Sequence, residues 1–461
     1  MLSSVVWFPA QAQGDGSAWL RAEARLTVPD TQSGRAVSKA LSHSLCAVEL
    51  ATSARWRGAS FCRMRSRATG AQSSRRLLVS QLYKLRYYGG EMERLPALAL
   101  TERAREWSVL PMPGVPALPM PKHVLDAAAE AATRVLPRET RGRPELRRVV
   151  ADHLGQQFGL DVDPEHELLV THGAQHGMSV VLRALLSPGD EVVVPAPTYF
   201  FDGMVRMAGA RPVYVPSRPE LGWATDLDAL RAAVTPATRA ILLCNPANPT
   251  GHTPARQELA EILALAAEHG LLVLSDESYA RYVHSGPGYA PQQSLRDGWP
   301  ELVTVTSLSK NYAFTPWRIG YVHAPRKLLD RVHRAFEWDA IAVGDVPQAA
   351  ACAVITGPQD WLDVVYSTFR RRRDLLAAAV EAAGLPVVRP DSGIFLFPDF
   401  AALGLRGRAL EDALLRHGIP GIAGDAFHGP AGHARLLYGG TEADLTEVGN
   451  RLAALVKELG G

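Results

Sequence analysis

Residues 241–275 read ILLCNPANPTGHTPARQELAEILALAAEHGLLVLS, and this stretch decides the fold class. It opens and closes with two short runs, 241–244 and 271–275, that are almost entirely apolar. Between them, residues 254–269 have the pattern of a helix. Strands that are apolar on both faces and separated by helices are typical of a mainly parallel sheet covered on both sides. The stretch therefore predicts an α/β domain.

Further apolar runs of the same kind lie on either side of this stretch. They cover 168–171, 192–195, 212–215, 302–306 and 319–322. Together with the first two runs they predict a large domain, residues 161–345, built on a mainly parallel seven-stranded sheet covered by helices.

The sequence outside this domain predicts a smaller α+β domain. Prolines between 111 and 121 exclude a helix and indicate an extended arm. With the helices that follow it, the arm makes up residues 92–160, which we group with an interdomain helix and C-terminal domain at 346–461. The expected elements are helices 122–135 and 144–158, a helical stretch 326–385, strand 393–398, helix 408–417, strand 434–438 and helix 443–458.

Composition excludes some classes of function. The 461 residues carry a net charge of only +2 and are 47% hydrophobic, which gives no reason to expect nucleic acid or membranes as partners. No apolar run is long enough to cross a bilayer. The four cysteines form no C-x-x-C pair, which fits a reducing compartment and favours a cytoplasmic protein.

Residues 1–91 differ from the rest in being rich in Arg, Ser and Ala, and we expect them to be disordered or non-native. A transit peptide, a basic arm for an acidic partner and an extension translated from upstream of the true start all fit this composition. We favour the extension, because codons for Gly89-Gly90-Glu91 can spell a ribosome-binding sequence just before Met92.

The residues that could carry chemistry follow the ends of the predicted strands, where ligands bind in such sheets. Ser307-Leu-Ser-Lys310 follows 302–306, and Arg318-Ile-Gly320 comes eight residues later. Asp276-Glu-Ser-Tyr279 follows 271–275 and supplies a carboxylate and a phenol. Read singly, the lysine could lie on the surface and the aspartate could be a helix N-cap. Because both segments follow the ends of predicted strands, we expect the lysine and the aspartate to belong to one site.

Three more segments complete the pattern. Asn245-Pro-Ala-Asn248-Pro-Thr-Gly251 has an irregular backbone that directs Asn248 inward. Thr171-His-Gly173-Ala174-Gln175 leads a strand into a helix, and the helix N-terminus favours an anion such as phosphate. Pro197-Thr-Tyr199 places an aromatic ring after a strand.

These five segments occur in the order typical of one enzyme family. Residues 107–460 resemble the class I/II aminotransferases, which are related to aspartate aminotransferase and have pyridoxal-phosphate (PLP) fold type I. The motifs are N-P-x-N-P-T-G at 245–251, D-E-x-Y at 276–279, S-x-S-K at 307–310 and W-R-I-G-Y at 317–321. The resemblance implies a homodimer whose sites lie at the subunit interface, with an amino acid and a 2-keto acid as substrates.

The resemblance also implies a role for each residue. Lys310 would form the internal aldimine with pyridoxal 5'-phosphate, Asp276 would pair with the pyridine nitrogen, and Tyr199 would stack on the ring. Asn248 and Tyr279 would bind the phenolic oxygen of the cofactor. The phosphate would be held by Gly173, Ala174, Gln175, Ser307 and Arg318. Arg435 would bind the substrate carboxylate, with Asn248 and the backbone of Gly114 beside it.

The residue types suit the chemistry of a PLP enzyme, but they do not decide which PLP reaction the protein catalyses. A cofactor that withdraws electrons needs its ring nitrogen protonated by a nearby acid, and an amine to move the Cα proton. Transamination is the expected reaction. C–S β-elimination, cyclisation, oxidation and a non-catalytic PLP-binding regulator remain alternatives, because they use the same motifs.

Two positions depart from the family pattern. Pro137 stands where the family has a tyrosine that reaches the neighbouring subunit's phosphate, and Pro316 stands where glycine is common. His172 and His176 have a zinc-ligand spacing, but no third ligand accompanies them, so we expect no metal.

Overall fold

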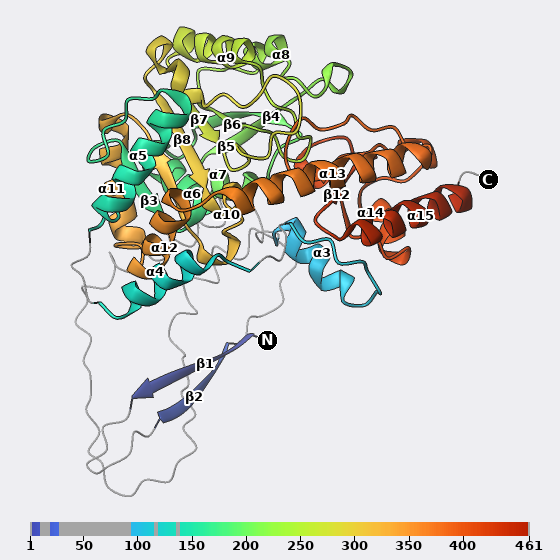
Figure 1. Ribbon diagram of the computed structural model, residues 1–461, viewed down its shortest axis with the longest axis horizontal. Coiled ribbons are helices and arrows are strands. Elements are labelled where there is room, and N and C mark those ends of the chain that lie inside the picture. Colours follow the sequence, from blue (N-terminus) through green and yellow to red (C-terminus); the bar gives the residue numbers. More distant parts are fainter. Residues whose placement is uncertain (1, 10–18, 27–93, 115–118, 135–138, 460–461) are drawn as a thin grey trace, which may run out of the picture. The chain divides into compact units, whose positions relative to one another are not determined.

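The computed structural model describes residues 2–9, 19–26, 94–114, 119–134 and 139–459 (Figure 1). Most of the N-terminal segment 1–91 and Pro137 lie outside these residues. Within the N-terminal segment, β1 (Leu2–Pro9) and β2 (Trp19–Leu26) pair antiparallel, which the sequence pattern did not predict.

A seven-stranded sheet organises the main body of the chain, as predicted. Its order is β3-β9-β8-β7-β6-β4-β5. The pairs from β8 through to β5 are parallel, and β9 runs antiparallel to both of its neighbours. The strands are β3 (Leu168–Thr171), β4 (Glu191–Ala196), β5 (Arg211–Pro216), β6 (Thr238–Cys244), β7 (Leu272–Asp276), β8 (Leu302–Ser307) and β9 (Gly320–His323).

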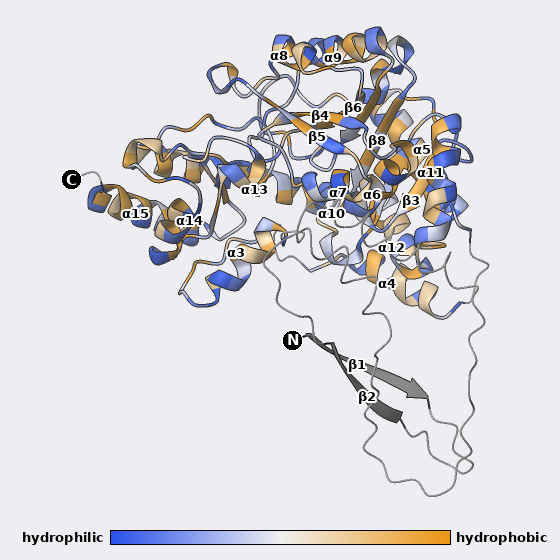
Figure 2. Cartoon of the chain, turned by 180° about the vertical axis from the view of Figure 1, so that it is seen from behind, coloured by the Kyte–Doolittle hydropathy of each residue, from blue (hydrophilic) through white to orange (hydrophobic). Residues whose placement is uncertain are grey.

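Alternate residues of each strand enter different cores, because side chains point to opposite faces of a sheet. On β6, Ala240 and Leu242 pack in one apolar cluster, whereas Ile241 and Leu243 pack in another. The first cluster includes side chains of the helices α4, α5, α6, α11 and α12, and the second those of α8 and α9. Helices thus cover both faces of the sheet. The strands of this sheet are among the most apolar parts of the chain (Figure 2).

The helices of this body are α4 (Lys122–Ala132), α5 (Pro144–Phe158), α6 (Gly173–Leu185), α7 (Asp202–Met207), α8 (Leu227–Ala232), α9 (Arg256–His269), α10 (Leu308–Asn311), α11 (Arg326–Asp339) and α12 (Asp345–Thr356). The sequence prediction groups α4 and α5 with the smaller domain. Their buried residues, including Val124 and Leu146, instead pack in the same cluster as the large sheet. Amphipathic spacing predicts that a helix is covered, but not by which element.

A second, antiparallel sheet has the order β10-β12-β11. Its strands are β10 (Phe395–Leu396), β11 (Gly421–Ala423) and β12 (Ala434–Leu437), and the helices are α3 (Pro96–Ala104), α13 (Asp360–Ala382), α14 (Gly407–Arg416) and α15 (Glu442–Leu459). Buried residues of α13, α14 and α15 share one apolar cluster with this sheet.

The predicted helical stretch 326–385 is three helices, α11, α12 and α13. Ile341 has a left-handed backbone with φ of +62°, and the chain restarts a helix after Gly344. Gly357 ends α12 in an extended conformation. Among the residues that the structure describes, no helix is both long and apolar enough to cross a membrane.

Candidate functional site

A cavity of about 350 Å³ opens at the carboxyl ends of β6, β7 and β8. Cys244, Asp276 and Ser307 are the last residues of these three strands, and all three line it. Nearly all of the predicted site residues meet there, although they come from segments far apart in the chain. They are Gly114, Ala174, Gln175, Tyr199, Asn248, Asp276, Tyr279, Ser307, Lys310, Arg318 and Arg435.

Lys310 lies on the short helix α10, whose start is fixed by Ser307. The Ser307 hydroxyl accepts a hydrogen bond from the Ser309 amide at 3.1 Å, as an N-cap does. Lys310 Nζ donates to the Gly114 carbonyl at 3.3 Å. Loss of hydration lowers the pKa of Lys310 to about 8, and the positive charges of Arg435 and Arg318 act in the same direction. The amine is therefore still mostly protonated at pH 7, but it loses its proton more readily than an exposed lysine does.

Asp276 is buried, with 7% of its surface exposed, and its carboxylate is held in one orientation. Oδ1 accepts hydrogen bonds from the Ser278 amide at 3.0 Å and the Ser278 hydroxyl at 2.5 Å. Burial raises the pKa of Asp276 to about 6, and the two bonds from Ser278 oppose that rise. A cationic group placed beside this carboxylate would keep it ionised.

Arg318 packs against the N-terminus of α6. Its Nη1 donates to the Ser309 hydroxyl at 3.0 Å and the Thr315 carbonyl at 3.2 Å. Gly173, the first residue of α6, has a φ of +79°, and a Cβ there would lie 2.8 Å from Arg318 Nη2. Glycine thus allows the guanidinium to reach the helix N-terminus. Helix amides and a guanidinium together favour an anion.

Arg435 is a buried guanidinium without an acidic partner among the described residues. It lies on β12, and its Nη1 donates to Asn248 Oδ1 at 3.0 Å. Asn248 Nδ2 donates in turn to the Tyr279 hydroxyl at 3.4 Å. Arg435 Nε is buried with no hydrogen-bond partner. Because a buried charge normally has a counter-charge, this arginine is suited to an anionic ligand.

Aromatic rings surround the guanidinium of Arg435. It lies 4.7 Å from the ring centre of Phe427, 5.7 Å from that of Phe200 and 5.8 Å from that of Phe395. Tyr199, next in sequence to Phe200, donates from its hydroxyl to Gln175 Oε1 at 3.4 Å. Burial raises the pKa of Tyr199, so the phenol is neutral at ordinary pH.

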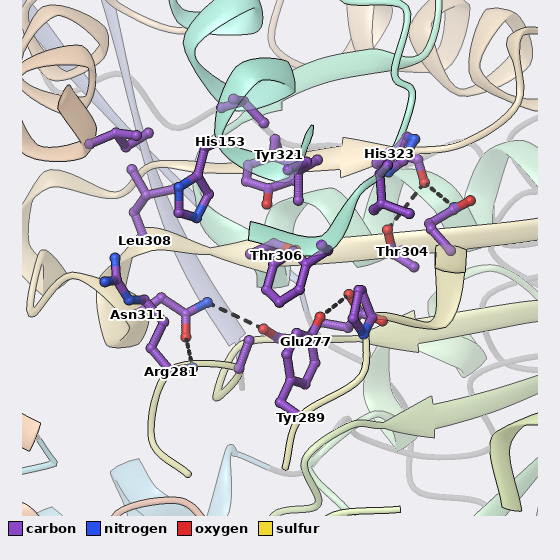
Figure 3. Close-up of a pocket in the computed structure, with 18 of the residues that line it drawn as sticks. His153, Glu277, Arg281, Tyr289, Thr304, Thr306, Leu308, Asn311, Tyr321 and His323 are labelled. Atoms are coloured by element: carbon purple, nitrogen blue, oxygen red, sulfur yellow. Dashed lines mark hydrogen bonds between the residues drawn. The ribbon is translucent and has the colours of Figure 1, made fainter. Parts of the chain in front are cut away.

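Figure 3 shows a second, separate pocket, in which the residues that follow Asp276 and Lys310 join the two segments. Asn311 Oδ1 accepts from the Arg281 amide at 3.1 Å, and Asn311 Nδ2 donates to the Glu277 carbonyl at 3.3 Å. The Glu277 side chain accepts from the Tyr289 hydroxyl at 2.6 Å. These bonds tie α10 to the loop after β7, and so help to hold Lys310 in place relative to Asp276.

Sequence reasoning missed several residues of the cavity. Ser278, Ser309 and Thr315 lie within the quoted motifs or a few residues from them, but no role was assigned to them. Leu95, Ala97 and Leu98, at the start of α3, line the cavity as well. A proline at the first position of an apolar segment, Pro96 in PALALTERA, is a helix-start signal that could have identified α3.

Comparison with known proteins is consistent across sequence and structure. The family profile "Aminotransferase class I and II" matches residues 114–452. Arginine–pyruvate transaminase of Pseudomonas aeruginosa is 35% identical over 373 residues, which cover 79% of this chain and 94% of that protein. Aspartate aminotransferase of Pyrococcus abyssi is 30% identical, covering 75% of this chain and 90% of its own length.

Solved structures match to a similar extent. Aspartate aminotransferase from Thermus thermophilus with maleate superposes with a TM-score of 0.75 at 30% identity, covering 80% of this chain and 98% of that one. N-succinyldiaminopimelate aminotransferase from Mycobacterium tuberculosis gives a TM-score of 0.74 at 31% identity, covering 81% and 99%.

Proposed function

Because this chain belongs to the class I and II aminotransferases, and is therefore an aminotransferase, we propose that it binds pyridoxal 5'-phosphate through Lys310. In this role it moves the amino group of an α-amino acid to a 2-keto acid. The family is PLP-dependent, and the residues of the cavity fit that cofactor.

One observation carries this proposal, the charge balance of the cavity. Its described lining holds three cations, Lys310, Arg318 and Arg435, and a single acid, Asp276. A phosphate near Arg318 and a carboxylate at Arg435 would supply the missing negative charge. The cofactor and an amino acid bring those two groups, together with an aldehyde for the lysine and a ring nitrogen for the aspartate.

The other contacts follow from the same geometry. Gly173, Ala174, Gln175 and Ser307, which lie beside Arg318 or line the cavity, would hold the phosphate with it. Asn248 and Tyr279, which bond to each other, would bind the phenolic oxygen of the cofactor, and Tyr199 would stack on its ring. Gly114 lies against Lys310, and its backbone would contact the substrate carboxylate alongside Arg435 and Asn248.

When bound, PLP would withdraw electrons from the substrate's Cα and so weaken the Cα–H bond. Asp276 would hold a proton on the ring nitrogen, because its carboxylate favours the charged form of that nitrogen. Arg435 would fix the carboxylate and hence the direction of the Cα–H bond. Lys310 Nζ, once the amino group of the substrate has displaced it and it is neutral, would take the Cα proton.

We further propose a homodimer in the cytosol. Trp338 and Ile341, near the end of α11, are 95% and 60% exposed, which is unusual for large apolar side chains and suits an interface. A monomeric mass with full activity at micromolar concentration would contradict the dimer.

The proposed cytosolic location rests on the cysteines. Cys244 and Cys352 are free thiols, which fits a reducing compartment.

The function is tested with purified protein and PLP. We expect visible absorbance from cofactor bound to the enzyme, and its loss when an amino acid donates its amino group. A 2-keto acid should restore it. Lys310→Ala should still retain PLP through the phosphate and ring contacts, but without these changes. Normal turnover by Lys310→Ala would refute the proposal.

A further inference from the structure

Phe427 lies where the small sheet meets segments of the large one. It is the last residue of a short 3₁₀ helix, Gly424–Phe427, which follows β11 of the small sheet. Its ring is completely buried and stacks on that of Phe200, which follows β4 of the large sheet, with the ring centres 4.8 Å apart. The Phe427 carbonyl accepts a hydrogen bond from the Thr198 amide at 3.0 Å. The side chain and the backbone of Phe427 thus both contact the segment that carries Tyr199.

The two residues after Phe427 continue this contact with the large sheet. The ring of His428 stacks on that of Tyr214 in β5, with the ring centres 3.6 Å apart and an angle of 11° between the planes. A Cβ on Gly429 would lie 2.7 Å from Pro197, so a side chain there would force one of the two loops to shift. The segment that begins at Phe427 is therefore held closely against the loop after β4.

The ring of Phe427 also contacts the guanidinium of Arg435. The guanidinium carbon lies 4.7 Å from the centre of this ring, closer than the 5.7 Å to Phe200 and the 5.8 Å to Phe395. Among the described residues, the hydrogen-bond partner of the guanidinium is Asn248 alone, which Nη1 contacts at 3.0 Å. A planar group held by one bond can tilt about it, whereas an aromatic ring packed against the cation attracts it and restricts the tilt.

We propose, resting on the proposed function, that Phe427 is a positioning residue that fixes the Arg435 guanidinium relative to Tyr199. Arg435 would bind the substrate carboxylate and Tyr199 would stack on the cofactor ring. The alignment of these two side chains therefore sets how the substrate lies against the cofactor, and such alignment affects the rate strongly. Phe427 is not among the described residues that line the cavity, so it acts through Arg435 and not by touching the substrate.

The first experiment compares Phe427→Leu with Phe397→Leu. Phe397 is a matched control, because it is buried in the same apolar cluster and is likewise not among the described lining residues of the cavity. The aromatic rings described around Arg435 do not include it. Its ring contacts that of Phe427 edge-on, with the centres 6.2 Å apart, so Phe397→Leu also controls for a general loosening of the cluster.

For each PLP-loaded variant, kcat/KM is measured with the fastest donor in a panel of standard amino acids and with the amine that lacks only its carboxylate. Phe427→Leu should lower kcat/KM about tenfold for the amino acid and leave the amine nearly unchanged. Phe397→Leu should show no such difference between the two compounds. Retention of PLP absorbance shows that each variant is folded.

The outcomes separate this inference from the proposed function. If Arg435→Lys loses activity with the amino acid alone but Phe427→Leu does not, the inference is overturned and the proposed function stands. Equal losses for the two compounds in Phe427→Leu, or the same selective loss in Phe397→Leu, would also overturn it. A parent enzyme that reacts with no amino acid would refute the proposed function, and this inference with it.

A double variant tests whether Phe427 acts through Arg435. Lysine has no plane to orient, so adding Phe427→Leu to Arg435→Lys should lower kcat/KM for the amino acid by less than about twofold further. A second loss of about tenfold would mean that the two residues act independently, and would overturn the inference. If Phe427→Leu does not retain PLP absorbance, the same measurements are made with Phe427→Met, whose flexible side chain fills irregular space in a core.

Discussion

Replacing Arg435 with lysine keeps a positive charge but removes the planar fork of the guanidinium. In the structure, Arg435 Nη1 is already bonded to Asn248 at 3.0 Å, while Nε is buried without a partner. A carboxylate ligand would bind the unused donors. Lysine offers one ammonium for both tasks, so it loses either the bond to Asn248 or the paired contact to the ligand.

The size of the effect follows from the bonds lost. A hydrogen bond to a charged group contributes about 1.5–3 kcal/mol, and the substitution removes at least one such bond along with the fixed orientation. We expect a total loss of about 3 kcal/mol, or roughly 100-fold in kcat/KM for an amino acid. PLP binding should change little, because Arg435 would touch the substrate and not the phosphate.

The assay measures kcat/KM for an α-amino acid and for a simple alkylamine, which has no carboxylate, alongside PLP affinity. The amino acid should show the full loss in Arg435→Lys and the alkylamine almost none. Equal losses for both compounds, or loss of PLP itself, would show that Arg435 supports the fold and does not bind substrate.

Four further predictions follow from the site. Asp276→Ala should slow Cα proton removal by several orders of magnitude while some PLP is retained, and near-normal single-turnover deprotonation would show that another group protonates the ring. Gly173→Ala and Gly384→Ala place a Cβ at the same φ of +79°, but only the first meets Arg318. Both should lower the free energy of unfolding by about 1–2 kcal/mol, and only Gly173→Ala should weaken PLP binding; equal PLP affinities would argue against a phosphate at this glycine. Because the pKa of Lys310 is lowered to about 8, its neutral form increases as pH rises through 8 and levels off above about pH 9. The rate at which PLP-free enzyme captures PLP should therefore rise about tenfold from pH 6 to pH 7 and become constant above about pH 9, whereas a rise continuing past pH 10 would mean an unshifted lysine. A protein comprising residues 92–461 should fold, bind PLP and stay active, and insolubility of that protein would place residues 1–91 in the fold.

Much of the large sheet could be predicted because its strands are buried on both faces. The run 241–244 is then apolar at every position, and the predicted strand 302–306 is only one residue shorter than β8. The cavity was also predictable, since strands of one sheet end at one edge. Asp276 and Ser307 follow directly from where β7 and β8 end.

Features that depend on which segments pack against each other in the folded chain leave no comparable signal in the sequence. β11 has only three residues, Gly421–Ala423, too few to show a period. β9 is antiparallel to its neighbours, which its apolar composition does not reveal. The bond between Arg435 and Asn248 joins residues 187 positions apart. Leu98 was missed for the same reason, because lining a cavity depends on where α3 packs.

The central claim is that Lys310 is the residue that holds PLP, and covalent trapping tests it most directly. The PLP-loaded enzyme is reduced with borohydride, digested and analysed by mass spectrometry. We predict that the peptide containing Lys310 carries the added mass of the reduced cofactor, and that Lys310→Ala carries none. Labelling of another lysine in the parent enzyme, or of the Lys310→Ala variant to the same extent, would contradict the account.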